Sequence, residues 1–339
     1  MNRFVTRREL LVSVAAALVA APTRAQTPKP PITLLGLNHV SLAVSNVQHS
    51  QEFYQRLFGM PLVHRQGSVP VLRIGWGPQF IALYNAGSAV PGIGHVCFAV
   101  EDFNPDRLMQ TLAVHGVAKT VPGTAPETAW VRMRGEKAGG AREGTPELYF
   151  NDPDGLTCQL QAATYCGGAG VNGELCTMNE RPASQPFPTR ALNHVTVAVS
   201  DQHRSLRFYQ RIFGMPVQAR QGAGVLLAAG AHPDFIAVSQ AAPNRKPQVD
   251  HFCVTVDDFD PDRIMKTLAG LGVKERTSST STSPMTSWVR WRQVNANGGG
   301  AGAPNGTPEV YFRDPDNIGG QIQDARYCGG SGLYGQVCP

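Results

Sequence analysis

The chain has 339 residues, more than one ordinary domain of about 150 residues holds, so two domains are expected. Hydrophobic residues make up 42% and charged residues 16%, which excludes wholesale disorder. The formal net charge is +5, but residues 1–25 carry four arginines against one glutamate. No later cluster of Lys and Arg is interleaved with aromatic residues, so the composition argues against nucleic-acid binding.

Residues 1–25 have the three parts of an export signal. A basic start is followed by the apolar residues 10–21, a run too short to cross a bilayer, and then by Thr23-Arg24-Ala25. The pair Arg7-Arg8 resembles a twin-arginine signal, with an ordinary secretory signal as the alternative. We therefore expect a periplasmic or secreted protein, cleaved near Ala25, with no stable membrane span.

The rest of the chain is one unit written twice. LNHVSLAV in residues 37–44 matches LNHVTVAV in 192–199, and HVCFAVEDFNPDR in 95–107 matches HFCVTVDDFDPDR in 251–263. The repeat is too long for a solenoid, so it predicts a duplicated domain. The expected domains are residues 34–177 and 191–339, joined by a Pro-rich polar linker over residues 178–190.

Each copy reads as a strand, a helix and further strands, twice over. The first helix is expected over residues 50–58, because Gly59 and Pro61 follow it. The second is expected after Asn104, which is followed by Pro105 in the first turn. Weaker strand patterns follow in VLRIG, FIALYN, WVRMR, ELYFN and TCQLQ, so the chain holds four such units.

Alternation along the strands places four histidines on one kind of face. In the first strand His39 and Ser41 oppose the branched residues Val40 and Leu42. The alternation fits a sheet with one face in water, or a curved sheet whose concave face lines a polar cavity. Two imidazoles on one such face need only a carboxylate to make a metal site with open positions. The four matched histidines are His39, His95, His194 and His251.

The motifs NHVSLAVSN, FYQRLFGMPL, GHVCFAV and YFNDPDG resemble the vicinal oxygen chelate superfamily. That group includes glyoxalase I, extradiol dioxygenases, fosfomycin-resistance proteins and bleomycin-binding proteins. The resemblance covers roughly residues 34–163 and 189–325. It implies an α+β fold of four βαβββ units, paired into two tandem cupped mixed-sheet barrels, with a divalent metal (Fe, Mn, Zn or Ni) inside. The two-barrel length resembles the extradiol dioxygenases most.

The resemblance also implies a set of metal ligands in each copy, and both sets depart from the family at one place. The position of the usual glutamate holds glutamine, which brings a carbonyl oxygen but no charge. Such a site would bind Fe(II) more weakly than two histidines and a carboxylate, and substrate oxygens, Glu147 or Glu309 are other sources of ligands. The implied ligands are His39, His95 and Gln159 in one copy, and His194, His251 and Gln321 in the other.

Two tyrosines fit the dioxygenase pattern, but a histidine is missing from it. Tyr149 and Tyr311 lie ten residues before the two glutamines and are the expected catalytic hydrogen-bond donors. The pattern also has an acid–base histidine shortly before that tyrosine, whereas residues 139–146 read GGAREGTP. Ring cleavage by the usual route is therefore disfavoured.

Four of the seven cysteines form matched pairs in Gly-rich tails. Cys166 and Cys176 are spaced as Cys328 and Cys338 are, and in an exported protein each pair predicts a disulfide. Bridges between the copies are left open, and the spacing does not suit a zinc site. The other three cysteines are expected to be buried thiols.

Two functions are compatible with these observations. The first is an exported metalloenzyme, extradiol-dioxygenase-like or glyoxalase-like, acting on a small molecule with adjacent oxygens. The second is a non-catalytic protein that binds a small molecule in the same cup without metal. Trp130 and Trp288 are expected in the core rather than against a ligand, and a homodimer is left open.

Overall fold

The structure is a computed structural model that describes residues 29–177, 186–231, 233–278, 282–293 and 302–338. The expected export signal, residues 1–25, lies outside the described residues, as do residues 178–185 of the expected linker. That linker ends slightly earlier than expected, because Thr189 and Arg190 already belong to a strand.

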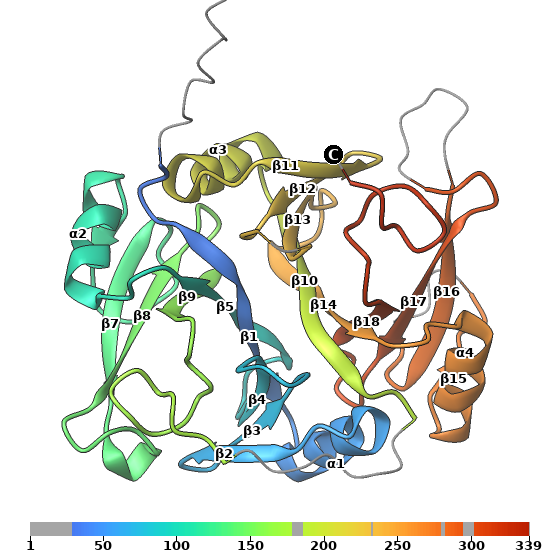
Figure 1. Cartoon of the computed structure of the whole chain (residues 1–339), viewed down its shortest axis with the longest axis horizontal. Helices are drawn as coiled ribbons and strands as arrows, with labels where there is room; N and C mark the ends of the chain where they lie inside the picture. Colours follow the sequence, from blue (N-terminus) through green and yellow to red (C-terminus); the bar gives the residue numbers. More distant parts are fainter. Residues whose placement is uncertain (1–28, 178–185, 232, 279–281, 294–301, 339) are drawn as a thin grey trace, which may run out of the picture.

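The first copy forms one nine-stranded mixed sheet with two α-helices (Figure 1). The order across the sheet is β2-β3-β4-β1-β5-β9-β8-β7-β6. Its elements are β1 (Leu34–Val44), α1 (Val47–Phe58), β2 (Leu62–Gln66), β3 (Val69–Arg73), β4 (Phe80–Asn85), β5 (Gly92–Val100), α2 (Pro105–Val114), β6 (Ala118–Lys119), β7 (Thr128–Arg134), a 3-10 turn η1 (Glu136–Ala138), β8 (Thr145–Asn151) and β9 (Thr157–Ala162).

The second copy repeats this arrangement, with the order β11-β12-β13-β10-β14-β18-β17-β16-β15. Its elements are β10 (Thr189–Val199), α3 (Gln202–Phe213), β11 (Val217–Gln221), β12 (Gly224–Ala228), β13 (Phe235–Gln240), β14 (Gln248–Val256), α4 (Pro261–Gly270), β15 (Lys274–Glu275), β16 (Thr286–Arg292), β17 (Thr307–Arg313) and β18 (Gly319–Asp324).

Each sheet joins two units at its centre. β1 runs parallel to β4 of its own unit and antiparallel to β5, which runs parallel to β9 of the next unit. The second sheet is joined in the same way through β10 and β14. The four βαβββ units and the two cupped sheets expected from the sequence are therefore confirmed.

Alternation along β1 separates the core from the cup, as expected. Val40, Leu42 and Val44 are fully buried in a hydrophobic core that spans both copies. His39 and Ser41 point the other way and line a cavity. The polar faces thus belong to curved sheets around cavities rather than to sheets with one face in water.

Helix α1 begins three residues earlier than expected. The side chain of Asn46 accepts a hydrogen bond from the backbone N–H of His49 and caps the helix. The end is as expected, because Gly59 adopts a left-handed conformation with φ 61°. Asn104 caps α2 in the same way, with Pro105 in the first turn.

The two copies pack through reciprocal Tyr–Asp hydrogen bonds. Tyr54 on α1 donates to Asp314 of the second copy at 2.9 Å, and Tyr209 on α3 donates to Asp152 of the first copy at 3.2 Å. Each aspartate also accepts two backbone N–H groups at the turn that follows its strand. Burial is the main cause that raises the pKa of Asp152 and of Asp314 to about 6.

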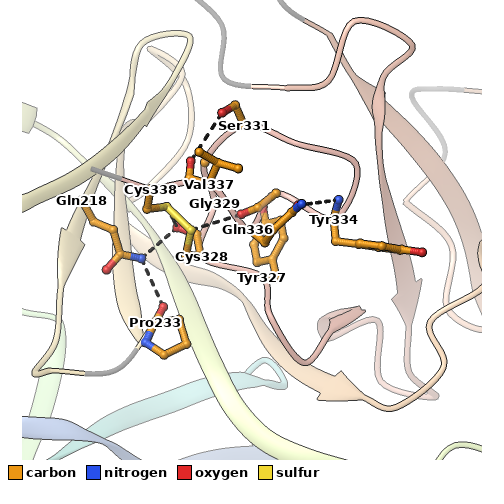
Figure 2. The surroundings of a disulfide bond; sticks show 12 residues. Gln218, Pro233, Tyr327, Cys328, Gly329, Ser331, Tyr334, Gln336, Val337 and Cys338 are labelled. Carbon is orange, nitrogen blue, oxygen red and sulfur yellow. Dashed lines mark hydrogen bonds between the residues drawn. A yellow bond between two sulfur atoms is a disulfide. The ribbon is translucent and has the colours of Figure 1, made fainter.

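Two disulfides close the Gly-rich tails, each within its own copy as expected. Cys166 is bonded to Cys176 and Cys328 to Cys338, and the other three cysteines are buried thiols. Figure 2 shows the second tail, where the amide of Gln218 donates to the backbone oxygens of Cys328 and Pro233. Within the described part of the chain, no helix is long and apolar enough to cross a membrane.

Candidate metal and ligand sites in the two cups

The first copy encloses a cavity of about 310 Å³, which we call the first cup. It is open to solvent on one side and mostly apolar, with polar groups at its base. Residues from eight strands meet there, since the sheet curves around it. They include His39, Phe80, His95, Trp130, Tyr149 and Gln159.

The structure brings the expected ligands of the first cup together. The Nε2 atoms of His39 and His95 lie 3.2 Å apart, and Gln159 lines the same cavity as both rings. Asn38 donates its amide N–H to the backbone oxygen of Tyr165, so its oxygen accepts from Nδ1 of His39 at 2.8 Å. This bond turns the Nε2 lone pair of His39 into the cup.

Burial keeps both histidines of the first cup uncharged. It is the main cause that lowers the pKa of His39 well below its usual value, with the neighbouring His95 as a further cause. The pKa of His95 falls to about 4, again mainly through burial. Neutral imidazoles are the form that binds metal ions.

The second cup also brings its three expected ligands together. Oε1 of Gln321 lies 3.1 Å from Nε2 of both His194 and His251. Nδ1 of His194 donates to the amide oxygen of Asn193, and Nδ1 of His251 donates to the carboxylate of Asp250 at 3.1 Å. Both rings therefore direct Nε2 at the amide oxygen of Gln321.

An amide oxygen that faces two imidazole Nε2 atoms can share a cation with them. The amide nitrogen of Gln321 is buried and has no hydrogen-bond partner, and the same holds for Gln159. A half-turn of the amide would instead donate its N–H groups to the rings. Glutamine thus suits both a metal-free and a metal-loaded cup, and these donor sets fit a divalent metal.

A metal site in either cup depends on this amide. Among the described residues, no group of three or more His, Cys, Asp or Glu could hold a metal ion. Glu147, considered above as a substitute ligand, accepts from Arg134 and Tyr165 on one oxygen and from Arg132 and Tyr149 on the other. Both of its oxygens are therefore already bonded.

The buried Glu147 organises the rest of the first cup. Burial alone would raise its pKa, but the guanidinium groups of Arg132 and Arg134 outweigh burial and lower it. Tyr149 donates to Glu147 at 3.1 Å, and burial is the main cause that raises the pKa of Tyr149 well above its usual value. Tyr149 is therefore a neutral hydrogen-bond donor beside His95, whose ring centre lies 5.4 Å away.

Trp130 is buried as expected whereas Trp288 is only partly buried, and both side chains also line the cups. Trp130 lines the first cup and stacks on Tyr149, and Trp288 lines the second and stacks on Tyr311. The sequence analysis also missed the arginines that follow each tryptophan. The signal was present in the repeated pattern Trp-x-Arg-x-Arg, because alternation along a strand places all three residues on the histidine face.

Comparison with known sequences agrees with the geometry of the cups. The profile of the Glyoxalase/Bleomycin resistance protein/Dioxygenase superfamily matches residues 36–160 and 191–282, one segment in each copy. The chain belongs to this superfamily.

Two curated relatives within this superfamily are enzymes. A glutathione transferase FosA from Serratia marcescens is 28% identical over 99 residues, which cover 28% of this chain and 70% of that protein. A lactoylglutathione lyase GLX1 from Arabidopsis thaliana is 25% identical over 191 residues, which cover 52% of this chain and 54% of that protein. This chain therefore spans about half the length of the lactoylglutathione lyase that it matches.

Solved structures share the two-cup fold at low sequence identity. A Mn(II)-bound glyoxalase from Novosphingobium aromaticivorans has a TM-score of 0.58 at 13% identity and covers 86% of this chain and 82% of its own. A catechol 2,3-dioxygenase has a TM-score of 0.59 at 14% identity and covers 91% and 90%. At these identities the likeness supports the fold alone.

Proposed function

We propose that this protein is a divalent-metal-dependent enzyme that acts on a small molecule carrying two adjacent oxygen atoms. The observation that carries the proposal is the convergence, in each cup, of two imidazoles and one buried glutamine amide. The proposed ligands are His39, His95 and Gln159 in the first cup, and His194, His251 and Gln321 in the second. The sequence relative named as a lactoylglutathione lyase supports an enzymatic function.

The residues around the proposed metal have separable tasks. When bound, the metal would act as a Lewis acid toward the adjacent oxygens of the substrate. Tyr149 is held neutral, and its hydroxyl would donate to a substrate oxygen in place of Glu147. Trp130 supplies an apolar wall, which limits water and favours a flat substrate. Tyr311 and Trp288 take the same tasks in the second cup.

Metal content and turnover test this proposal together. Full-length protein purified without chelator should contain up to two divalent metal ions per chain, and His39→Ala combined with His194→Ala should remove them. The control His49→Ala with His203→Ala removes two exposed histidines outside the cups and should keep the metal. Catechol and a methylglyoxal–thiol adduct are the first substrates to screen. Wild-type protein without stoichiometric metal, or unchanged metal in the double variant, would overturn the proposal.

A second candidate, metal-free binding of a small aromatic molecule, is favoured by one feature. Both cups have lost the family's carboxylate ligand, and the lining of the first cup holds no histidine besides His39 and His95. Catechol binding measured with and without a chelator separates the two candidates. Binding unaffected by the chelator, with no turnover, selects the binding protein.

We further propose that the chain is exported through residues 1–25. The two disulfides suit an oxidising compartment. The mass of the protein recovered from the periplasm should correspond to cleavage near Ala25. An uncleaved cytoplasmic product would contradict export.

A further inference from the structure

The second cup carries two arginines that the first cup lacks. Arg276 follows β15, where the first copy has Thr120, and Arg313 ends β17, where the first copy has Asn151. The Arg276 guanidinium lies 3.9 Å from the centre of the Trp288 ring, and that of Arg313 lies 5.9 Å from the same centre. Two positive groups therefore gather on one side chain that lines the cup.

Neither of these arginines forms an ion pair with a described residue. Desolvation is the main cause that lowers the pKa of Arg276, and the positive charge of Arg313 lowers it further. The only described polar contact of Arg313 is with the backbone oxygen of Asn317 at 3.3 Å, and its Nε is buried without a partner. The nearby carboxylate of Asp250 interacts electrostatically with Arg313 but is hydrogen-bonded to His251, so the two arginines keep an excess of positive charge that an anionic partner would stabilise.

The sequence around the second cup also lacks acids that could neutralise them. Residues 276–308 contain no Asp or Glu, whereas the matching residues 120–146 contain Glu127, Glu136 and Glu143. This holds for every residue of the segment, whether or not the structure describes it. The segment that carries Arg276 and Trp288 therefore supplies no carboxylate of its own to neutralise Arg276.

Two carboxylates do lie in the second cup, and both are engaged. Asp250 accepts from Nδ1 of His251, and Glu309 is bonded by Arg292, Tyr327 and Tyr311. Arg290 reaches Glu309 only at 3.8 Å, whereas Nε of its counterpart Arg132 donates to Glu147 at 2.8 Å. Arg290 therefore keeps donor capacity that Arg132 has spent.

Glycine makes room for Arg313 in the second cup. A Cβ atom at Gly319 would lie 3.1 Å from Nη1 of Arg313, and the first copy has Thr157 at the matching position. In the first copy Thr157 instead donates to the side chain of Asn151. The two copies therefore differ at both positions together: the first has Asn151 and Thr157, and the second has Arg313 and Gly319. The exchange leaves the guanidinium lining a cavity of about 260 Å³ together with Trp288 and Arg290.

We infer that the second cup binds a small molecule through an anionic group, a carboxylate or a phosphate, held by Arg276, Arg290 and Arg313. Guanidinium groups bind both kinds of oxyanion through paired N–H donors. The anionic group lies beside His251, so a ligand anchored there extends toward the proposed metal ligands. The inference deepens the proposed function by naming a ligand class for one cup, but it does not require metal.

Binding of simple anions to chelator-treated full-length protein tests the inference separately from metal binding. Benzoate and phenyl phosphate are the probes, and uncharged benzamide is the neutral comparison. Binding of each probe is measured from the broadening of its NMR signals. At least one anion should bind, with Arg276→Gln plus Arg313→Gln weakening it about tenfold or more. Comparing benzoate with phenyl phosphate also distinguishes a carboxylate site from a phosphate site.

A charge-matched variant and a single variant keep the test decisive. Arg142→Gln plus Arg207→Gln removes two exposed arginines outside the cups and should leave binding within about twofold of wild type. Arg276→Gln alone spares the partly buried Arg313, so it reports on the site should the double variant fail to fold. Equal binding of benzamide and the anions, or unchanged binding in the Arg276 variant and the double variant, would overturn the inference. Loss of metal from the protein would leave it standing.

Discussion

The two cups share their proposed metal ligands but differ in what surrounds them. Each has two histidines and a glutamine in matching places, with an asparagine that orients the first histidine. The first cup then surrounds its ligands mainly with apolar and aromatic side chains, and the second adds arginines. The two copies therefore share their proposed metal ligands but differ in the side chains that would contact a bound small molecule.

The differences between the cups come in compensating pairs. Where the first copy has Tyr84 and Gly94, the second has Ser239 and Asp250. A Cβ atom at Gly94 would lie 1.9 Å from the hydroxyl of Tyr84, so the tyrosine and a side chain at position 94 exclude each other. Substituting one member of such a pair alone would leave a clash or a gap, which explains why the changes occur together.

The largest expected effect is the loss of metal binding from one cup at a time. His39→Ala should empty the first cup and His194→Ala the second, each lowering metal binding in its own cup by more than about 100-fold. Each single variant should therefore keep one metal ion per chain when measured by elemental analysis.

Turnover of the same two variants then assigns activity to a cup. If only one cup is active, one variant loses turnover and the other keeps it. Equal partial losses would show that both cups work. A single substitution that removes both metal ions would contradict independent cups.

The interface between the copies predicts a pH dependence of stability. Asp152 and Asp314 each have a pKa near 6 in the folded protein against 3.8 for an ordinary aspartate. They bind protons more tightly when folded, so their contribution is full below about pH 4 and is lost as the pH rises through 6. The full loss is about 3 kcal/mol for each carboxyl, of which about 1.4 kcal/mol falls between pH 5 and pH 8 and is measured there as the free energy of unfolding in urea.

Isosteric amides test the source of this dependence in each copy. In Asp152→Asn and Asp314→Asn the side-chain oxygen can still accept the two backbone N–H groups, while the titration is removed. Each variant should flatten the pH dependence by a similar amount, because the two contacts are reciprocal. A residual slope of the same sign should remain, since burial also raises the pKa of Asp234 to about 7. An unchanged slope in both variants would rule out this assignment.

The disulfides predict a smaller effect that should be equal in the two copies. Each bond closes a loop with a sequence separation of 10, so Cys166→Ser with Cys176→Ser should cost roughly 2–3 kcal/mol of stability. Cys328→Ser with Cys338→Ser should cost the same amount in chemical unfolding. Costs that differ by more than about 1 kcal/mol would show that the tails support the two copies unequally.

Most of the fold could be predicted from the sequence because it is periodic and repeated. Alternation in β1 placed His39 on the cup face, and Gly59 marked the end of α1. The contacts between the copies could not be predicted, because Tyr54 and Asp314 are 260 residues apart and neither carries a local signal. Trp130 was assigned to the core on residue type alone, although its alternation with Arg132 and Arg134 places it on the cup face.

The smallest predicted effect concerns the carboxylate that orients one histidine. Asp250 accepts from Nδ1 of His251, and this hydrogen bond lowers the pKa of Asp250 to about 2, whereas Gly94 offers His95 no such side chain. A carboxylate partner raises the basicity of a histidine ligand, so Asp250→Asn should weaken metal binding in the second cup about tenfold.

The reverse exchange, Tyr84→Ser with Gly94→Asp, should strengthen metal binding in the first cup by a similar factor. Gly94→Asp alone should not, because Tyr84 occupies the space. Competition with a metal-binding dye in His194→Ala and His39→Ala backgrounds isolates each cup. If the paired exchange leaves the affinity of the first cup unchanged while Asp250→Asn lowers that of the second, then the carboxylate acts through the arginines around it rather than through the histidine.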